Sequence, residues 1–220
     1  MAKLITPAFR VAFIEGKDAN DGDKWKHFLL DGTVCIDGKT KEPNGKLKYG
    51  LCAIWTPARF TSREKAQWKA ILEALDVVSK EKFKRAWADL PASFKKGIRD
   101  GSEAEYSGFG PGTKFANLSC VKPASAARPE IITLQGEIIS RENENVHLLY
   151  PGCWARGTVN PYPFDVPQNR GLGLGFRNLQ ILDSTAPRLD GGASAKDDFG
   201  DEDVELAHLV SEQDEQAVEE

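Results

Sequence analysis

The chain contains the stretch Cys153-Trp-Ala-Arg-Gly-Thr-Val-Asn-Pro-Tyr-Pro-Phe-Asp165, in which two kinds of side chain alternate. Successive side chains of a β-strand point to opposite faces of a sheet. One face would carry the large and polar residues Trp154, Arg156, Thr158, Asn160, Tyr162 and Phe164, and the other the small or apolar Ala155, Gly157 and Val159. Because Pro161 and Pro163 lack the N–H that a central strand needs, we expect an edge strand or the root of a loop.

The face that carries the rings has the chemistry that single-stranded nucleic acid requires. Any base can stack on an aromatic ring for about 1–3 kcal/mol, and an interleaved guanidinium can meet the phosphate. The alternative interpretation is that the rings fill a hydrophobic core. Burial of Trp154, Tyr162 and Phe164 would place the stacking surface elsewhere.

Runs of β-type sequence lie on both sides of a helical block. The first three are separated by Asp-Gly, Asp-Gly-Lys and Pro-Asn-Gly, which are hairpin signals. The order of strands, helices and strands predicts a mainly β protein, with an antiparallel sheet and a helical insertion at about 61–100; closure into a barrel would remove exposed edges. The runs are 8–15, 27–36, 46–55, 114–121, 131–140, 146–159 and 172–182.

The helical block begins with a capping box, Thr61-Ser-Arg-Glu64. Trp68, Ile71, Leu72 and Leu75 follow at helical spacing, which predicts a helix from about 62 to 78. A second helix, broken at Pro91, is predicted from the spacing of Phe83, Trp87, Leu90, Phe94 and Ile98, with Lys95, Lys96 and Arg99 pointing away from that apolar stripe.

Charge is divided unevenly along the chain. Eleven of the 33 acidic residues fall in 197–220, so residues 1–196 carry 29 Lys and Arg against 22 Asp and Glu, a net charge of +7. An acidic segment of this kind is expected to be disordered, because it buries too little apolar surface to offset the entropy of ordering. We therefore expect one domain over 1–190 and a flexible acidic tail over 191–220, attached through Gly191-Gly-Ala-Ser-Ala195. Solubility alone is the alternative role for this tail.

The bulk properties predict a soluble intracellular protein without metal or cofactor. No apolar run reaches the ~18 residues of a membrane span, and the N-terminal residues lack the apolar stretch of a signal peptide. Cys35, Cys52, Cys120 and Cys153 are far apart in sequence, which predicts reduced and mostly buried thiols. A zinc site assembled from distant segments is the alternative.

Two glycine-containing motifs and the histidines argue against nucleotide chemistry and catalysis. Gly38-Lys39-Thr40 lacks the preceding glycine of a phosphate loop, because position 33 is Thr. Gly171-Leu-Gly-Leu-Gly175 continues in strand-like sequence, which favours a strand approached closely by another backbone or a ligand. The three histidines, His27, His147 and His208, stand apart, so we predict a non-enzymatic protein.

Cations near the strands would supply the electrostatic part of binding. Lys46 and Lys48 share one face of their predicted strand, and Lys114, Arg170 and Arg177 lie near glycine-rich turns. Each alone fits a solvated surface. A body of charge +7 nevertheless favours polyanions at moderate salt.

Three motifs together resemble the C-terminal signature of bacteriophage single-stranded-DNA-binding proteins with a modified OB-fold. They are Tyr150-Pro-Gly-Cys-Trp154, Asn160-Pro-Tyr-Pro-Phe164 and Gly171-Leu-Gly-Leu-Gly-Phe-Arg-Asn-Leu-Gln180. The resemblance is specific over 146–183 and looser over 1–60. It implies an OB-fold-like, five-stranded antiparallel barrel, sequence-independent coating of single-stranded DNA, and roles in phage replication, recombination and repair in the cytoplasm of the infected bacterium.

In that family the tail competes with DNA and recruits phage or host replication and recombination proteins, often through a terminal aromatic residue. This chain departs from the pattern, because it ends in Glu219-Glu220 and its one tail aromatic is Phe199. The resemblance implies a partner-binding role for Asp201, Glu202, Asp203, Glu219 and Glu220.

The combined hypothesis is a DNA-binding protein without membrane contact. Its stacking residues would be Trp154, Tyr162, Phe164 and Phe176, and its phosphate-binding residues would be Lys46, Lys48, Lys114, Arg156, Arg170 and Arg177. The rival hypothesis is an adaptor that binds no DNA and docks replication or recombination enzymes.

Overall fold

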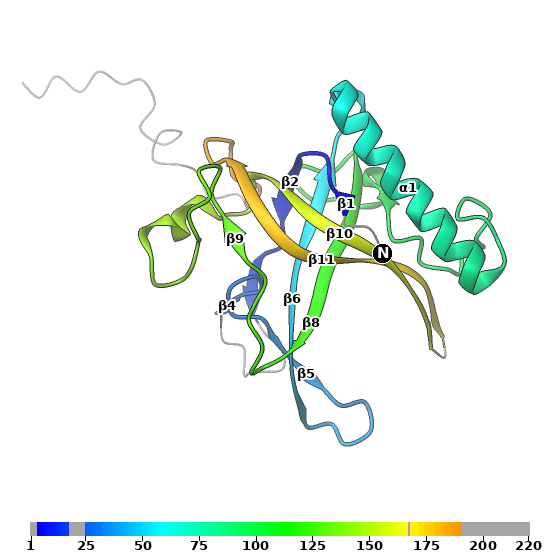
Figure 1. The fold of residues 1–220 in the computed structure, drawn as a ribbon, viewed down its shortest axis with the longest axis horizontal. Helices are drawn as coiled ribbons and strands as arrows, with labels where there is room; N and C mark the ends of the chain where they lie inside the picture. The colour runs from blue at the N-terminus through cyan, green and yellow to red at the C-terminus, as the bar shows by residue number, and fades with distance from the viewer. Residues whose placement is uncertain (1–3, 18–24, 167, 191–220) are drawn as a thin grey trace, which may run out of the picture.

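The computed structural model describes residues 4–17, 25–166 and 168–190, and within them the protein is mainly β with a single α-helix (Figure 1). A nine-stranded sheet forms the body, and a separate two-stranded sheet pairs β3 with β4. The strands are β1 (Leu4–Ile5), β2 (Phe9–Ala12), β3 (Glu15–Lys17), β4 (Trp25–His27), β5 (Thr33–Ile36), β6 (Pro43–Trp55), β7 (Arg99–Asp100), β8 (Lys114–Pro123), β9 (Ile131–Ile132), β10 (Trp154–Val166) and β11 (Asn169–Asp183). The helix α1 spans Ser62–Phe83, and short 3-10 turns occupy Pro57–Arg59, Gly101–Glu103 and Glu144–Leu148.

The strand pairing of the large sheet is mixed. β10 pairs with β2, β2 with β6, β6 with β8, β8 with β11, and β11 again with β10. β11 runs parallel to both β8 and β9, whereas the other pairs are antiparallel. The expectation of a wholly antiparallel sheet is therefore wrong, because the segment between β8 and β11 crosses over and brings β11 beside β8 in the same direction.

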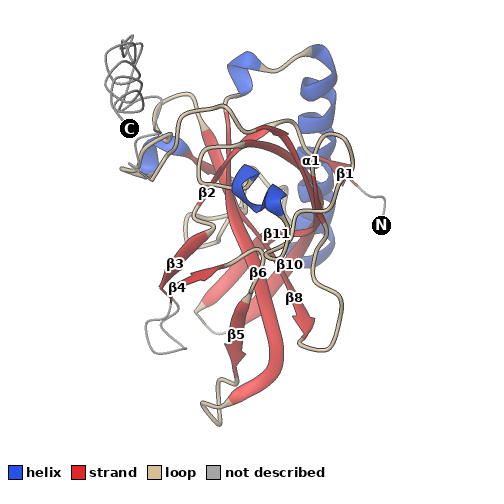
Figure 2. Ribbon diagram, turned by 90° about the vertical axis from the view of Figure 1, so that its left-hand side faces the viewer, coloured by secondary structure: helices blue, strands red, loops and turns tan. Residues whose placement is uncertain are grey.

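The core lies between the sheet and α1, which packs along one side of the strands (Figure 2). Trp55 is fully buried, with its ring edge-on to Phe9 at 5.5 Å and 5.2 Å from the ring of Trp68 on α1. Ile71 and Leu75 continue the apolar side of the helix into this core. The predicted capping box is confirmed, because Thr61 accepts from the Glu64 N–H at 3.2 Å while Glu64 accepts from the Thr61 N–H at 2.9 Å.

The predicted second helix is wrong. α1 continues to Phe83 and stops at Lys84, whose left-handed backbone (φ 58°) closes the helix. Between Arg85 and Ile98 the described chain forms turns and bends, with one isolated β-bridge at Lys95, rather than a helix. The apolar side chains that suggested a helix, Trp87, Leu90, Phe94 and Ile98, pack individually against the core.

The β10–β11 hairpin is the longest in the described part of the chain and projects beyond the body (Figure 1). β10 runs from Trp154 through both prolines to Val166. Residues 160–166 of β10 pair with β11 alone, since β1 and β2 reach only as far as Val159 and Ala155. The predicted edge position of this segment is therefore confirmed.

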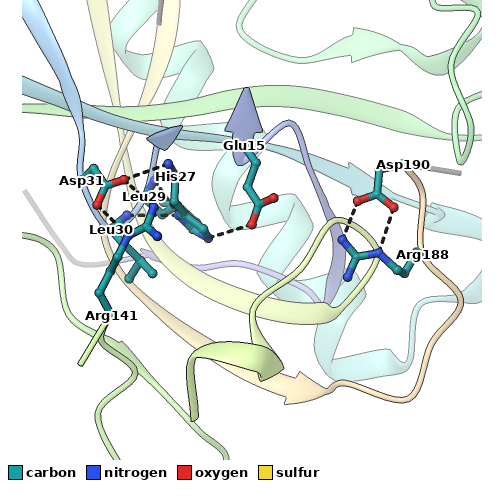
Figure 3. Close-up of polar contacts among 8 residues, drawn as sticks. All are labelled: Glu15, His27, Leu29, Leu30, Asp31, Arg141, Arg188 and Asp190. Atoms are coloured by element: carbon teal, nitrogen blue, oxygen red, sulfur yellow. Dashed lines mark hydrogen bonds and ion pairs between the residues drawn. The ribbon is translucent and has the colours of Figure 1, made fainter. Parts of the chain in front are cut away.

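A polar network around the buried His27 holds the end of β4 to the segment after β9 (Figure 3). The Nδ1 atom of His27 accepts from the Leu29 and Leu30 N–H groups, and Asp31 accepts from the His27 N–H at 2.9 Å. Arg141 donates two hydrogen bonds to Asp31, at 2.8 and 2.6 Å. Burial, together with the charge of Arg141, lowers the pKa of His27 to about 4.

After β11 the chain returns across the body as far as Asp190, which pairs with Arg188 (Figure 3). Tyr150 donates to the Ala186 carbonyl at 2.6 Å, and the Leu189 N–H donates to the Pro151 carbonyl at 2.9 Å. The acidic tail 191–220 lies outside the described residues, as do its partner-binding residues Asp201, Glu202, Asp203, Glu219 and Glu220. No helix within the described ranges is long and apolar enough to cross a bilayer.

Candidate nucleic-acid interface

The face of β10 predicted to carry rings is partly exposed. Ala155 and Val159 are 0% and 2% exposed, whereas residues of the other parity are half-buried or exposed, which confirms the predicted alternation. The Tyr162 side chain is 38% exposed and its ring centroid lies 6.3 Å from that of Phe164. These two rings are therefore accessible at the free end of the hairpin.

The glycines of β11 make room for the side chains of β10. Across the ladder, Gly173 is the partner of Tyr162 and Gly175 is the partner of Asn160. A Cβ at Gly173 would lie 2.6 Å from the Cζ atom of Tyr162, and one at Gly175 would lie 3.1 Å from the Oδ1 atom of Asn160. The Tyr162 ring thus lies across the sheet surface over Gly173, where any larger residue would displace it.

Gly171 packs closely against the backbone of Lys95 instead of a side chain of β10. The Lys95 N–H donates to the Arg170 carbonyl at 3.0 Å, and the Leu172 N–H donates to the Lys95 carbonyl at 2.7 Å. Gly171 has a φ of 151°, and a Cβ at this position would collide with the backbone of Lys95. This contact holds the segment that follows α1 against the β10–β11 hairpin.

The same segment brings cations to the rings. Lys95, Lys96 and Arg99 line one groove together with Lys48 of β6 and Tyr162 and Phe164 of β10. The groove has a volume of about 460 Å³, and no acidic side chain is among the described residues that line it. Trp87 holds the backbone at Lys96 in place, because its indole N–H donates to the Lys96 carbonyl at 2.7 Å. We call this surface the basic groove.

Polar uncharged residues also line the basic groove. Asn117 and Ser119 of β8 are among its lining residues, together with the cations and the rings. The arrangement places accessible rings, four cations and amide and hydroxyl groups on one concave surface, which can accept a polyanion whose flat bases stack on the rings.

The profile of one protein family matches residues 37–209. That family is described as the single-stranded-DNA-binding protein of Enterobacter phage Enc34. The match spans most of the chain, including α1, the segment that follows it with Lys95 and Lys96, and the β10–β11 hairpin. The chain belongs to this family.

Solved structures from bacteriophage Enc34 share the fold of this family member. The single-stranded DNA-binding protein of that phage has a TM-score of 0.53 at 16% identity, with 89% of this chain and 88% of that chain covered. The same protein in complex with single-stranded DNA has a TM-score of 0.51 at 16% identity, covering 81% and 85%. Its C-terminal truncation has a TM-score of 0.52 at 15% identity, covering 81% and 84%. A search of curated proteins gave no match.

The structure brings only some of the predicted site residues of this family member to the basic groove. Lys48, Tyr162 and Phe164 line it, and Arg177 is exposed in an adjoining hollow that also touches Tyr162. Lys46, two residues before Lys48 on β6, is exposed and is not among the residues that line the groove.

Three other predicted cations are engaged elsewhere. Lys114 forms an ion pair with Asp100 at 2.5 Å, and hydrogen bonds from Lys114 and Ser102 hold the pKa of Asp100 below its usual range. Arg170 pairs with Asp165 at 2.8 Å, and Arg156 donates to Gln180 at 2.8 Å.

Two predicted stacking residues do not lie in the basic groove. Phe176 is 2% exposed and shares the core-facing side of β11 with Leu172 and Leu174, so its ring cannot stack a base and the prediction is wrong. Trp154 is half-buried at the opposite end of β10, where Arg10 lies over its ring at 5.6 Å. Trp154 is the first residue of β10 and Tyr162 lies towards the far end of the strand, so the two rings are far apart.

Sequence reasoning omitted Lys95, Lys96, Arg99 and Asn117 from the site. The signal for the first three was present, because they depart from the apolar spacing of their segment. Their neighbourhood with Tyr162 depends on the backbone contact between Lys95 and Gly171, which the local pattern does not encode.

Proposed function

We propose that the protein binds single-stranded DNA without sequence preference. The match to the family and the solved complex of the Enc34 protein with single-stranded DNA support the binding. The observation that carries the proposal is the basic groove, in which Tyr162 and Phe164 face the same space as Lys48, Lys95 and Arg99. Bases would stack on the two rings while the cations neutralise phosphates. Neither contact distinguishes one base from another.

The proposal extends to the setting in which such binding is used. The protein would coat single strands during replication, recombination and repair of phage DNA inside the infected bacterium, as a binding protein and not an enzyme. The acidic tail would compete with DNA for the groove and recruit replication proteins. Its net charge supports the first role, because a tethered polyanion acts at high effective concentration.

We further propose that the strand circuit β10, β2, β6, β8, β11 is an OB-type barrel. The support is the pairing pattern, which returns from β11 to β10 and includes one parallel pair, β8 with β11. An OB-type barrel binds oligonucleotides on a strand face and its flanking loops. Strands and a loop also line the basic groove.

The test is a fluorescence-anisotropy titration of a labelled oligothymidylate at several salt concentrations. Four groove cations that each displace one counterion predict a slope of log affinity against log salt of about −3. A single-stranded oligonucleotide of mixed base sequence and equal length should bind with similar affinity, and duplex DNA of equal length should bind more weakly. Affinity independent of salt, or a preference for duplex, contradicts the proposal.

A further inference from the structure

A second group of exposed rings lies away from the basic groove, around Phe13. Phe13 follows β2 with a φ of 52° and is 48% exposed, although a left-handed backbone is rare for a bulky aromatic residue. Its ring meets that of Tyr106 edge-on at 5.1 Å, and Tyr106 is 64% exposed. Phe109 is 5.9 Å from Phe13 and 6.1 Å from Tyr106. These three residues form the Phe13 cluster.

The Phe13 cluster packs on buried apolar side chains of the protein. Phe109 is half-buried and packs edge-on against the buried Phe115 at 5.0 Å. Leu189 packs on the same apolar patch, and a Cβ at Gly108 would lie 2.8 Å from its side chain. The cluster therefore presents its two outer rings from a fixed base, at little further cost in conformational entropy when a ligand binds.

The surface between the Phe13 cluster and the basic groove is continuous. Arg99 and Asn117 line the basic groove and also the hollow of about 750 Å³ that contains Phe13, Tyr106 and Phe109. Phe13 and Asn117 further share a hollow of about 310 Å³ with Lys48. The same cation and amide side chains thus connect the two sets of rings.

The strand register sets the distance between the two sets of rings. Ala12, next to Phe13, pairs with Cys52, and Cys52 pairs with Asn117. From β8 the ladder continues to β11 and then to Tyr162 on β10 (Figure 1). Four steps between adjacent strands correspond to about 19 Å along the sheet, or about six nucleotides at the stacked spacing of 3.4 Å.

We infer that the Phe13 cluster is a second base-stacking platform for the same DNA strand. The strand would cross β10, β11, β8, β6 and β2 in turn, with bases on Tyr162 and Phe164 at one end and on Phe13 and Tyr106 at the other. Glu103 and Glu105 also line the hollow at the Phe13 cluster. The phosphates must therefore follow the side of Arg99, while the bases lie over the rings. This inference rests on the proposed function and specifies the extent of its site.

The test compares oligothymidylates from about four to sixteen nucleotides, the span of OB-type site sizes. The variants are Tyr106→Ala, Phe13→Leu and Tyr162→Ala, with Tyr106→Phe as the conservative control. We expect Tyr106→Ala and Phe13→Leu to lower affinity for the long oligonucleotides at least about fivefold, the effect of losing one stacked base. Affinity for the shortest ones should change less than about twofold, because they occupy the basic groove alone. Tyr162→Ala should weaken binding at all lengths, and Tyr106→Phe should bind like the unmodified protein.

The outcomes separate this inference from the proposed function. If the unmodified protein binds no oligonucleotide, the proposed function fails. If it binds, and Tyr106→Ala and Phe13→Leu match it at every length while Tyr162→Ala does not, the inference of a second platform is wrong. Equal losses at all lengths would also contradict the inference. Thermal melting of each variant verifies that affinity losses do not come from unfolding.

Discussion

The ring of Tyr162 lies over Gly173, its partner across the β10–β11 ladder, so closely that a Cβ at 173 would be 2.6 Å from the ring carbon Cζ. A glycine on one strand thus sets the position of an aromatic ring on the next. In a protein that stacks bases on this ring, the glycine acts as a positioning residue.

Gly173→Ala should weaken binding of single-stranded DNA by about tenfold, within the range expected for losing one stacked base. The added methyl group displaces the far end of a flexible side chain, so the stability of the fold should change little. Anisotropy titration measures the affinity and urea denaturation the stability. In a Tyr162→Ala background the same substitution should have no additional effect, since the ring it displaces is gone. Gly38→Ala is the control, because no atom beyond its two chain neighbours lies within 4 Å of the place that its new methyl group would take.

Gly171→Ala should act on stability instead. The new Cβ would collide with the backbone of Lys95 at a φ of 151°, so we expect a loss of at least about 2 kcal/mol in the free energy of unfolding. Urea denaturation against Gly38→Ala measures this loss. Unchanged stability would show that the contact between Lys95 and Gly171 is unimportant for holding the segment after α1 against the β10–β11 hairpin.

Removal of single groove cations should alter the salt dependence of binding. Lys48→Ala, Lys95→Ala and Arg99→Ala should each reduce the steepness of log affinity against log salt by about 0.7, the contribution of one phosphate contact. Lys69→Ala is a matched control, because Lys69 lies on α1 and pairs with Glu73 there. A slope that changes equally for Lys69→Ala would indicate a response to net charge alone.

The stability of the fold should fall as the pH drops from about 6.5 towards 4. The pKa of His27 is about 4 in the folded protein and 6.5 as its ordinary value, so between these values the unfolded chain binds the proton and the folded chain does not. The contribution is complete above pH 6.5 and amounts to about 3 kcal/mol. Urea denaturation at pH 7 and pH 4.5 measures it. His27→Asn keeps an acceptor for the Leu29 and Leu30 N–H groups and should remove most of this pH dependence.

Deletion of residues 191–220 should tighten binding of single-stranded DNA several-fold at low salt and change it little at high salt. Eleven carboxylates are removed, and screening weakens their competition as salt rises. Anisotropy titrations of both chains at two salt concentrations measure the difference. A full-length chain with these carboxylates changed to amides should behave like the truncated one. Equal affinities at low salt would leave the tail without a role in competition.

The alternation along β10 and the start of α1 could be predicted because both depend on neighbouring residues. The alternation along β10 indicates which side chains face the core. The capping box consists of hydrogen bonds between Thr61 and Glu64, which are only three residues apart. The second helix could not be judged from spacing, because Trp87 and Phe94 meet the core through separate tertiary contacts. The burial of Phe176 has a different reason, because its parity with Leu172 and Leu174 is a local signal that points to the core.

The sequence by itself determined a mainly β protein with a basic body, an acidic tail and a strand that carries its rings on one face, since composition and short-range periodicity carry that information. Only the tertiary structure decided which cations join those rings. Lys95, Lys96 and Arg99 reach Tyr162 because the Lys95 backbone pairs with Gly171, a contact between segments more than seventy residues apart. Contacts of this kind depend on the closure of long loops around a shared core, and no local pattern of side chains specifies them.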